Sequence, residues 1–114
     1  MQIPIEIETP DIRLGFDIAG KDGSLKTGAY VDAPGGVRIT YQGAIERRAI
    51  DIPALLQFIV DASVTLELSL FAAWLYDKVK DRSVTRMKIG RKVITEITPE
   101  SIKQTLEEEI EIDK

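Results

Sequence analysis

Residues 51–81 read DIPALLQFIVDASVTLELSLFAAWLYDKVKD, and this stretch decides the fold that the sequence predicts. Asp51 precedes a run with Pro53 in its first turn, which is typical of a helix start, and the next Gly or Pro is Gly90. The stretch ends in a mostly cationic turn, residues 78–82, which suits the negative end of a helix dipole. We therefore predict one long helix over residues 51–81.

The apolar residues of this predicted helix fall on two stripes of a helical wheel, about 140° apart. The first stripe comprises Leu55, Ile59, Ala62, Leu66, Leu70 and Trp74. The second comprises Val60, Val64, Leu68, Phe71 and Leu75. A single sheet cannot easily cover both stripes, so either the rest of the chain buries the second or a protein partner contacts it. That partner would be another protein or a second copy of the chain.

The residues before position 50 alternate between apolar and polar, as half-buried strands require. Strands are predicted over residues 12–18, 25–31 and 37–41, with turn residues at 20–23 and 34–36 between them. This half reads as an antiparallel meander of three or four strands.

After the long helix, residues 84–89 and 92–97 are predicted to form two strands joined by Gly90 and Arg91, a loop that suits a type II′ hairpin. Thr98 then caps a final helix with Pro99 at its first position. The sequence thus predicts a single α+β domain over residues 1–114. Its mainly antiparallel sheet, a β-meander plus a C-terminal hairpin, carries one long and one short helix on one face.

Composition argues against catalysis. The 114 residues include no His and no Cys. The chain therefore lacks the usual general base, the usual partner of a Ser or Cys nucleophile and the commonest transition-metal ligands. Short-range carboxylates such as Glu6, Glu8 and Asp11 lack the spacing of a calcium loop. We therefore expect no enzymatic activity, no catalytic residue, no cofactor and no metal.

Two features bear on localisation. Residues 1–8 lack the basic start and continuous apolar run of a signal peptide. The chain also contains no Cys, so nothing in it points to an oxidising compartment. Residues 52–76 are long and apolar enough to span a membrane. They include Asp61 and Glu67, however, and a central carboxylate costs about 2.5–3.5 kcal/mol. We expect a cytoplasmic chain without a membrane partner.

Residues 77–92 form a basic segment with seven Lys and Arg against two Asp. It could neutralise the phosphates of a nucleic acid or another polyanion, with Trp74 and Tyr76 as stacking rings. The competing interpretation, which we favour, pairs the basic hairpin with the acidic run Glu107–Glu111 inside the chain. Nucleic acid is then not the expected partner.

From Ile52 onward the order is a long apolar helix with Trp74-Leu75 near its end, a basic turn, a hairpin at residues 89–93 and Thr98-Pro99-Glu100 opening a final helix. This C-terminal half resembles the effector-associated constant component domains of bacterial conflict systems. The resemblance implies a non-enzymatic adaptor in bacterial defence. The predicted function is therefore protein interaction through the long helix, by way of Val60, Val64, Leu68, Phe71 and Leu75; polyanion binding through residues 78–92 is the alternative.

Overall fold

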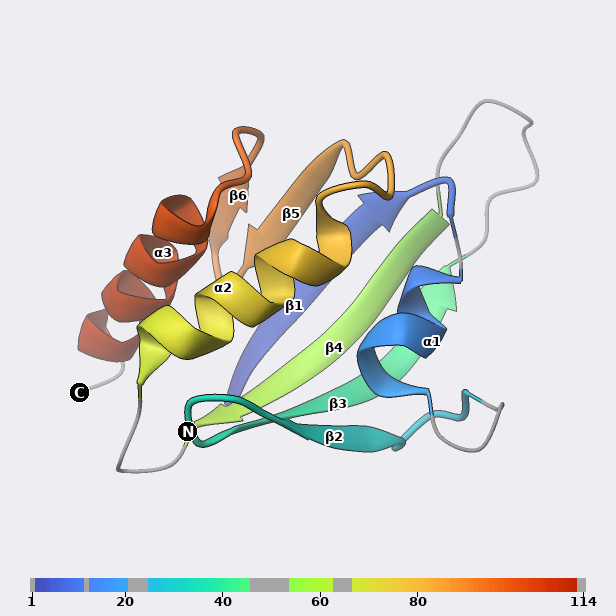
Figure 1. The fold of residues 1–114 in the computed structure, drawn as a ribbon, viewed down its shortest axis with the longest axis horizontal. Helices are drawn as coiled ribbons and strands as arrows, with labels where there is room; N and C mark the ends of the chain where they lie inside the picture. The colour runs from blue at the N-terminus through green and yellow to red at the C-terminus, as the bar shows by residue number, and fades with distance from the viewer. Residues whose placement is uncertain (1, 12, 21–24, 46–53, 63–66, 113–114) are drawn as a thin grey trace.

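The computed structural model describes residues 2–11, 13–20, 25–45, 54–62 and 67–112. Within these residues, six strands form one sheet and three helices lie on one of its faces (Figure 1). In chain order the elements are β1 (Gln2–Thr9), α1 (Leu14–Ala19), β2 (Tyr30–Ala33), β3 (Val37–Ile45), β4 (Ala54–Ala62), α2 (Leu68–Val79), β5 (Arg86–Ile89), β6 (Lys92–Ile94) and α3 (Pro99–Ile112). The strand order is β2-β3-β4-β1-β5-β6, and every neighbouring pair is antiparallel. The predicted α+β class with a mainly antiparallel sheet is confirmed.

Strand β1 lies in the middle of the sheet, although no element is predicted there from the sequence. It pairs with β4 on one side and β5 on the other, so residues from both halves of the chain flank the N-terminal strand. Ile3, Ile5 and Ile7 point toward the helices and are buried, while the intervening residues point to the opposite face. This period-two pattern is what a strand with one covered face requires.

The predicted helix over residues 51–81 is wrong. Residues 54–62 form strand β4 and residues 68–79 form helix α2, while residues 51–53 and 63–66 lie outside the described residues. Along β4, Leu56, Phe58 and Val60 are buried at period two. Aromatic and β-branched residues favour strands, and a central strand often reads as a nearly continuous apolar run that a helix can also show.

The strand predicted over residues 12–18 is also wrong, because residues 14–19 form helix α1. Leu14 and Ile18, four positions apart, are both buried on the side of this helix that faces the sheet. The carboxylate of Asp11 accepts a hydrogen bond from the Arg13 backbone N–H at 3.0 Å, which favours the turn before the helix. Strand β2 starts at Tyr30 rather than at residue 25.

The C-terminal elements follow in the predicted order, although β5 starts at Arg86 rather than at residue 84 and β6 ends at Ile94 rather than at residue 97. Strands β5 and β6 pair across Gly90 and Arg91, and Gly90 has the positive φ of 60° that the first residue of a type II′ turn needs. The Thr98 hydroxyl accepts a hydrogen bond from the Ser101 N–H at 3.0 Å, and the Ser101 hydroxyl accepts one from the Thr98 N–H at 2.9 Å. This reciprocal pair caps α3 as predicted.

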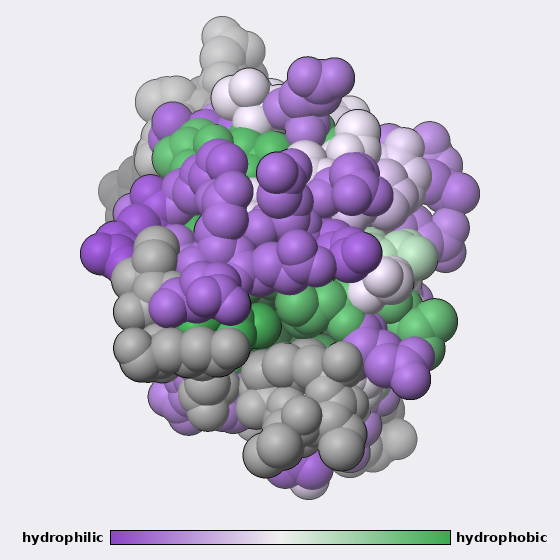
Figure 2. Space-filling view, turned by 90° about the vertical axis from the view of Figure 1, so that its left-hand side faces the viewer, coloured by the Kyte–Doolittle hydropathy of each residue, from purple (hydrophilic) through white to green (hydrophobic). Residues whose placement is uncertain are grey.

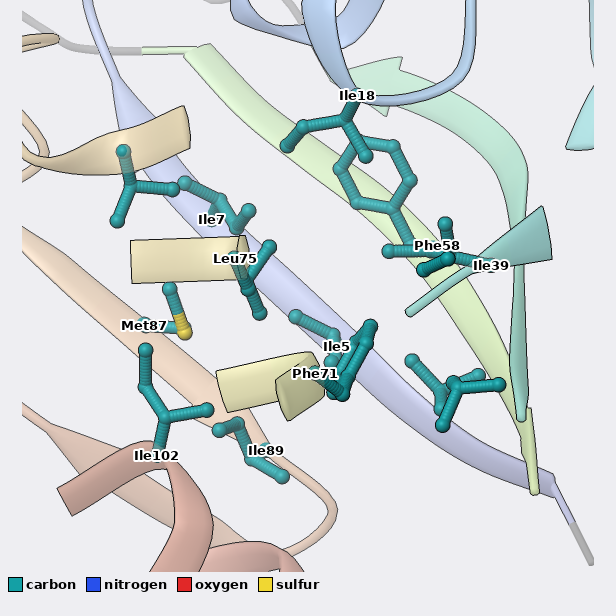
Figure 3. Packing of buried hydrophobic residues seen from close by; sticks show 14 of the residues in the cluster. Ile5, Ile7, Ile18, Ile39, Phe58, Phe71, Leu75, Met87, Ile89 and Ile102 are labelled. Atoms are coloured by element: carbon teal, nitrogen blue, oxygen red, sulfur yellow. The ribbon is translucent and has the colours of Figure 1, made fainter. Parts of the chain in front are cut away.

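The hydrophobic core fills the space between the helices and the covered face of the sheet (Figure 3). Phe58 from β4, Phe71 and Leu75 from α2 and Ile102 from α3 are among its fully buried side chains. Among the described residues, no helix is both long and apolar enough to cross a membrane.

Candidate interaction surface

Of the five residues predicted to contact a partner, the four that the structure describes do not form an exposed surface. Phe71 and Leu75 of α2 are fully buried, and Val60 of β4 is 2% exposed. Leu68 is partly buried and packs against the same core, while Val64 lies outside the described residues. The structure therefore brings four of the five together, but inside the molecule. The proposed contact surface on a long helix is corrected accordingly.

The apolar face of helix α2 packs against the core and not against a partner, because the start of the helix is held against the β2–β3 turn. The backbone N–H of Glu67 donates a hydrogen bond to the Gly35 carbonyl at 3.0 Å. Gly35 has φ of 93°, and a Cβ there would collide with the Glu67 carbonyl oxygen, so this turn requires glycine. The contact orients α2 so that Phe71 points into the core, where its ring stacks on Trp74 with centroids 5.9 Å apart.

The face of the sheet opposite the helices is a surface that the sequence-based prediction missed. We call it the open face. Side chains from all six strands reach it, namely Pro4, Glu6, Glu8, Tyr30, Asp32, Arg38, Thr40, Ile45, Leu55, Gln57, Ile59, Asp61, Arg86, Lys88 and Val93. Leu55 and Ile59, in the middle of the sheet, are only half-buried, and Val93 and Ile45 are each 48% exposed. Apolar and charged groups thus alternate across a face that none of the described helices covers (Figure 1).

A shallow hollow of about 260 Å³ lies on the open face over four neighbouring strands, β4, β1, β5 and β6. Glu6, Glu8, Leu55, Arg86, Lys88 and Val93 line it. Glu6 lies directly opposite Lys88, and Glu8 opposite Arg86, in the β1–β5 register. Arg86 Nε donates to Glu8 Oε2 at 2.8 Å, and the Thr85 hydroxyl donates to Glu8 Oε1 at 2.9 Å. The hollow therefore contains two carboxylates beside two cations.

The far end of the open face, on β2 and β3, has a separate charged pair. Arg38 Nε donates to Asp32 Oδ1 at 2.8 Å, and the guanidinium lies 4.1 Å from the centroid of the Tyr30 ring. The hydrogen bond to Asp32 raises the pKa of Arg38 above its usual value. This end of the face is therefore cross-linked across two strands, and its tyrosine is 41% exposed.

The basic segment does not form a single cationic surface. Lys80 pairs with Asp77 at 2.9 Å, Arg86 with Glu8, and Lys92 Nζ with Glu108 at 3.4 Å. The Arg91 backbone N–H donates to the Glu109 carboxylate at 3.0 Å. Figure 2 faces the side of the molecule where α3 and β6 lie and shows it covered mostly by hydrophilic residues. The acidic helix α3 therefore neutralises part of the hairpin, in the way the favoured interpretation expected.

Arg82 forms a polar cluster between α1 and the α2–β5 connection. Its guanidinium contacts Asp11 at 2.9 Å and also Asp17, and its carbonyl accepts a hydrogen bond from the Thr9 hydroxyl at 2.6 Å. The hydrogen bond from Arg82 is the main reason that the pKa of Asp11 lies below its ordinary value of 3.8. In the described part of the chain, no three acidic side chains converge as a metal site would need. The cluster links two segments of the chain and offers no free carboxylate pair for chemistry.

Comparisons with known proteins found no relative of this chain. No family model matches it, and neither the search of curated proteins nor that of solved structures returned a significant match.

Proposed function

We propose that this chain is a non-enzymatic protein-interaction module that binds its partner through the open face of the sheet. The observation that carries the proposal is that Val93 is exposed, and Leu55 and Ile59 are partly exposed, on a face that the described helices leave uncovered. Apolar side chains that stay in water cost free energy, and burying them against a protein surface recovers it. The surrounding ion pairs would provide orientation and specificity.

The composition supports a binding role over catalysis. A chain without His and Cys lacks the side chains that most often act as base, nucleophile or metal ligand near neutral pH. The same absence of Cys supports the proposal that the module works in the cytoplasm. The resemblance of the C-terminal half to effector-associated constant component domains extends the proposal to an adaptor in a bacterial conflict or defence system.

Polyanion binding through residues 78–92 remains the alternative, and the charge arrangement favours it less. Five of the seven cations in this range have a carboxylate or an aromatic ring as neighbour, namely Lys78, Lys80, Arg82, Arg86 and Lys92. A phosphate backbone would have to displace these neighbours before it gained their charge.

Site-specific photo-crosslinking tests the proposed function. A photo-reactive phenylalanine analogue replaces Ile59 on the open face, and a matched variant carries it at the exposed Ala73 of α2. In cells that make the protein, illumination should give a discrete protein adduct from position 59 and none from position 73. Equal adducts from both positions, or none from position 59, would contradict the proposal.

A further inference from the structure

The charges around the hollow are ordered in columns along the strands. Strand β5 presents the two cations Arg86 and Lys88 on the open face, and its neighbour β1 presents the two anions Glu8 and Glu6. Val93 of β6 lies beside the cations, on the side away from β1. Leu55 of β4 lies beside the anions, on the side away from β5. Across the four strands the sequence of side chains is therefore apolar, cationic, anionic and apolar.

This order is complementary to itself after a half-turn. A two-fold axis that runs parallel to the strands, between β1 and β5 and outside the open face, exchanges the two columns. It places β5 of one copy over β1 of the other and β6 over β4. Lys88 then faces Glu6 of the second copy, and Arg86 faces its Glu8, because each of these pairs shares one register position along the strands.

We propose that the partner of the open face is a second copy of this chain, docked face to face about this axis. The inference rests on the proposed function, since it names the occupant of the same surface. Stacked sheets lie about 10 Å apart, a distance that a Lys and a Glu side chain from opposite sheets span together. The long stems of Arg86 and Lys88 from each copy enter the hollow of the other and fill it.

Two other symmetric arrangements place like charges together. An axis perpendicular to the strands would put β5 over β5, so that cations face cations. An axis directly over β1 would put Glu6 and Glu8 over the same residues of the second copy. Like charges in contact across an interface are strongly disfavoured, so the column order disfavours both of these axes and favours the one between β1 and β5, which opposes unlike charges.

The apolar residues at the rim of this overlap add to the pairing. Val93 shares its register position with Lys88 and Glu6, and Gln57 lies opposite Glu6 on β4. The half-turn therefore places Val93 of one copy over Gln57 of the other, flanked by the half-buried Leu55 and Ile59. Side chains that are exposed in one copy become covered in the pair.

The decisive experiment uses two charge-reversal variants. Each alone should dissociate the dimer, and a mixture of the two should restore it. Sedimentation equilibrium at about 200 µM, a concentration at which pairs with a micromolar dissociation constant are associated, should give the wild-type chain twice its mass of 12.7 kDa. Lys88→Glu alone and Glu6→Lys alone should each weaken association at least about tenfold and sediment as monomers. An equimolar mixture of the two variants should regain the dimeric mass, since each residue 6 then faces an opposite charge at residue 88.

Matched variants control for charge and folding. Lys103→Glu and Glu107→Lys reverse an ion pair on α3, away from the open face, and should leave the mass unchanged. The double variant Glu6→Lys with Lys88→Glu keeps the cross-strand pair within one chain, so it is informative even if a single reversal fails to fold. It should form homodimers but no mixed dimers with the wild type, measured by native mass spectrometry.

Two results would overturn the second-copy proposal. In the first, the wild-type chain stays monomeric at this concentration. In the second, the wild type is dimeric but the mixture of variants stays monomeric. Dimers that persist in both single reversals would also overturn it. These failures are distinct from failure of the interaction function. A monomeric wild type whose position 59 crosslinks to a different protein in cells would refute the homodimer and leave the module intact.

Discussion

The two faces of the central strands differ in what they require of the sequence. Toward the helices, β1 and β4 present Ile5, Phe58 and Val60, which are almost completely buried. Toward the other side, the same strands present Glu6, Gln57 and Ile59, which remain partly in contact with water. Neighbouring positions of one strand therefore differ in role: one face holds the fold together, and the other stays partly in contact with water.

The largest expected loss of stability tests the difference between the two faces at two adjacent residues of β4. Phe58→Ala should lower the free energy of unfolding by about 3–5 kcal/mol, because it removes a buried ring and leaves a cavity. Ile59→Ala, one residue further along β4, should cost about 1 kcal/mol, since much of that side chain is already in water. Urea denaturation at a few micromolar chain would measure both. Equal losses would show that the open face is as much a part of the core as the covered one.

A smaller effect is expected where the hairpin meets α3 on the covered side. Gly90→Val should destabilise the chain by about 1–3 kcal/mol, because valine resists positive φ and its Cβ would collide with the Glu109 side chain. Gly28→Val is the control: Gly28 also has positive φ, of 96°, but no atom lies within 4 Å of the place that a Cβ would occupy there. Thermal melting that changes equally in both variants would attribute the whole cost to the backbone and none to contact with α3.

The sequence predicted the regions in which local signals decide the structure. Gly90 with Arg91, and Thr98 with Pro99, fix a turn and a helix start through their own backbone chemistry, and both are found where predicted. The segment around Phe58 has no such signal, because a continuous apolar run fits a central strand and a buried helix equally well. Its strand state follows from pairing with Ile5 more than 50 positions earlier, which period and propensity do not reveal.

The same ambiguity between strand and helix explains why the sequence did not predict the open face. Leu14 and Ile18 fit both the alternation of a strand and the spacing of one helical turn, and the short helix they form covers one end of the sheet. A prediction that places β4 in a helix cannot anticipate an open sheet face with Leu55 and Ile59. The alternation of apolar and other residues over positions 3–8, with isoleucine at every second one, is the signal that could have revealed it.

The smallest expected effect concerns the polar cluster at the edge of the covered face, and it depends on pH. Arg82 lowers the pKa of Asp11 in the folded chain below 3.8, so this carboxylate contributes stability above that pH and loses the contribution as the pH falls through its folded pKa. Asp11→Asn should therefore reduce stability at about pH 6 and approach the wild type in acid. Chemical denaturation at several pH values would measure the difference.

The matched control is Asp77→Asn. Lys80 lowers the pKa of Asp77 as well, but the carboxylate is 70% exposed, so its loss should hardly change stability at any pH. A gap between wild type and Asp11→Asn that stays constant into strong acid would show that Arg82 does not act on the charge of Asp11.

The central position of β1 also governs the order in which the chain can fold during its synthesis. Strand β1 is made before both of its neighbours, β4 and β5, and Ile89 of β5 is made some 80 residues after β1 is complete. At about 5–20 residues per second, several seconds pass before both neighbours of β1 have been made. Contacts between such distant parts of the chain form slowly, and exposed strands are prone to aggregate in the meantime. Pro4 and Glu6, which lie between the isoleucines of β1, and Glu8, which follows them, hinder premature pairing of β1 with other chains during this time.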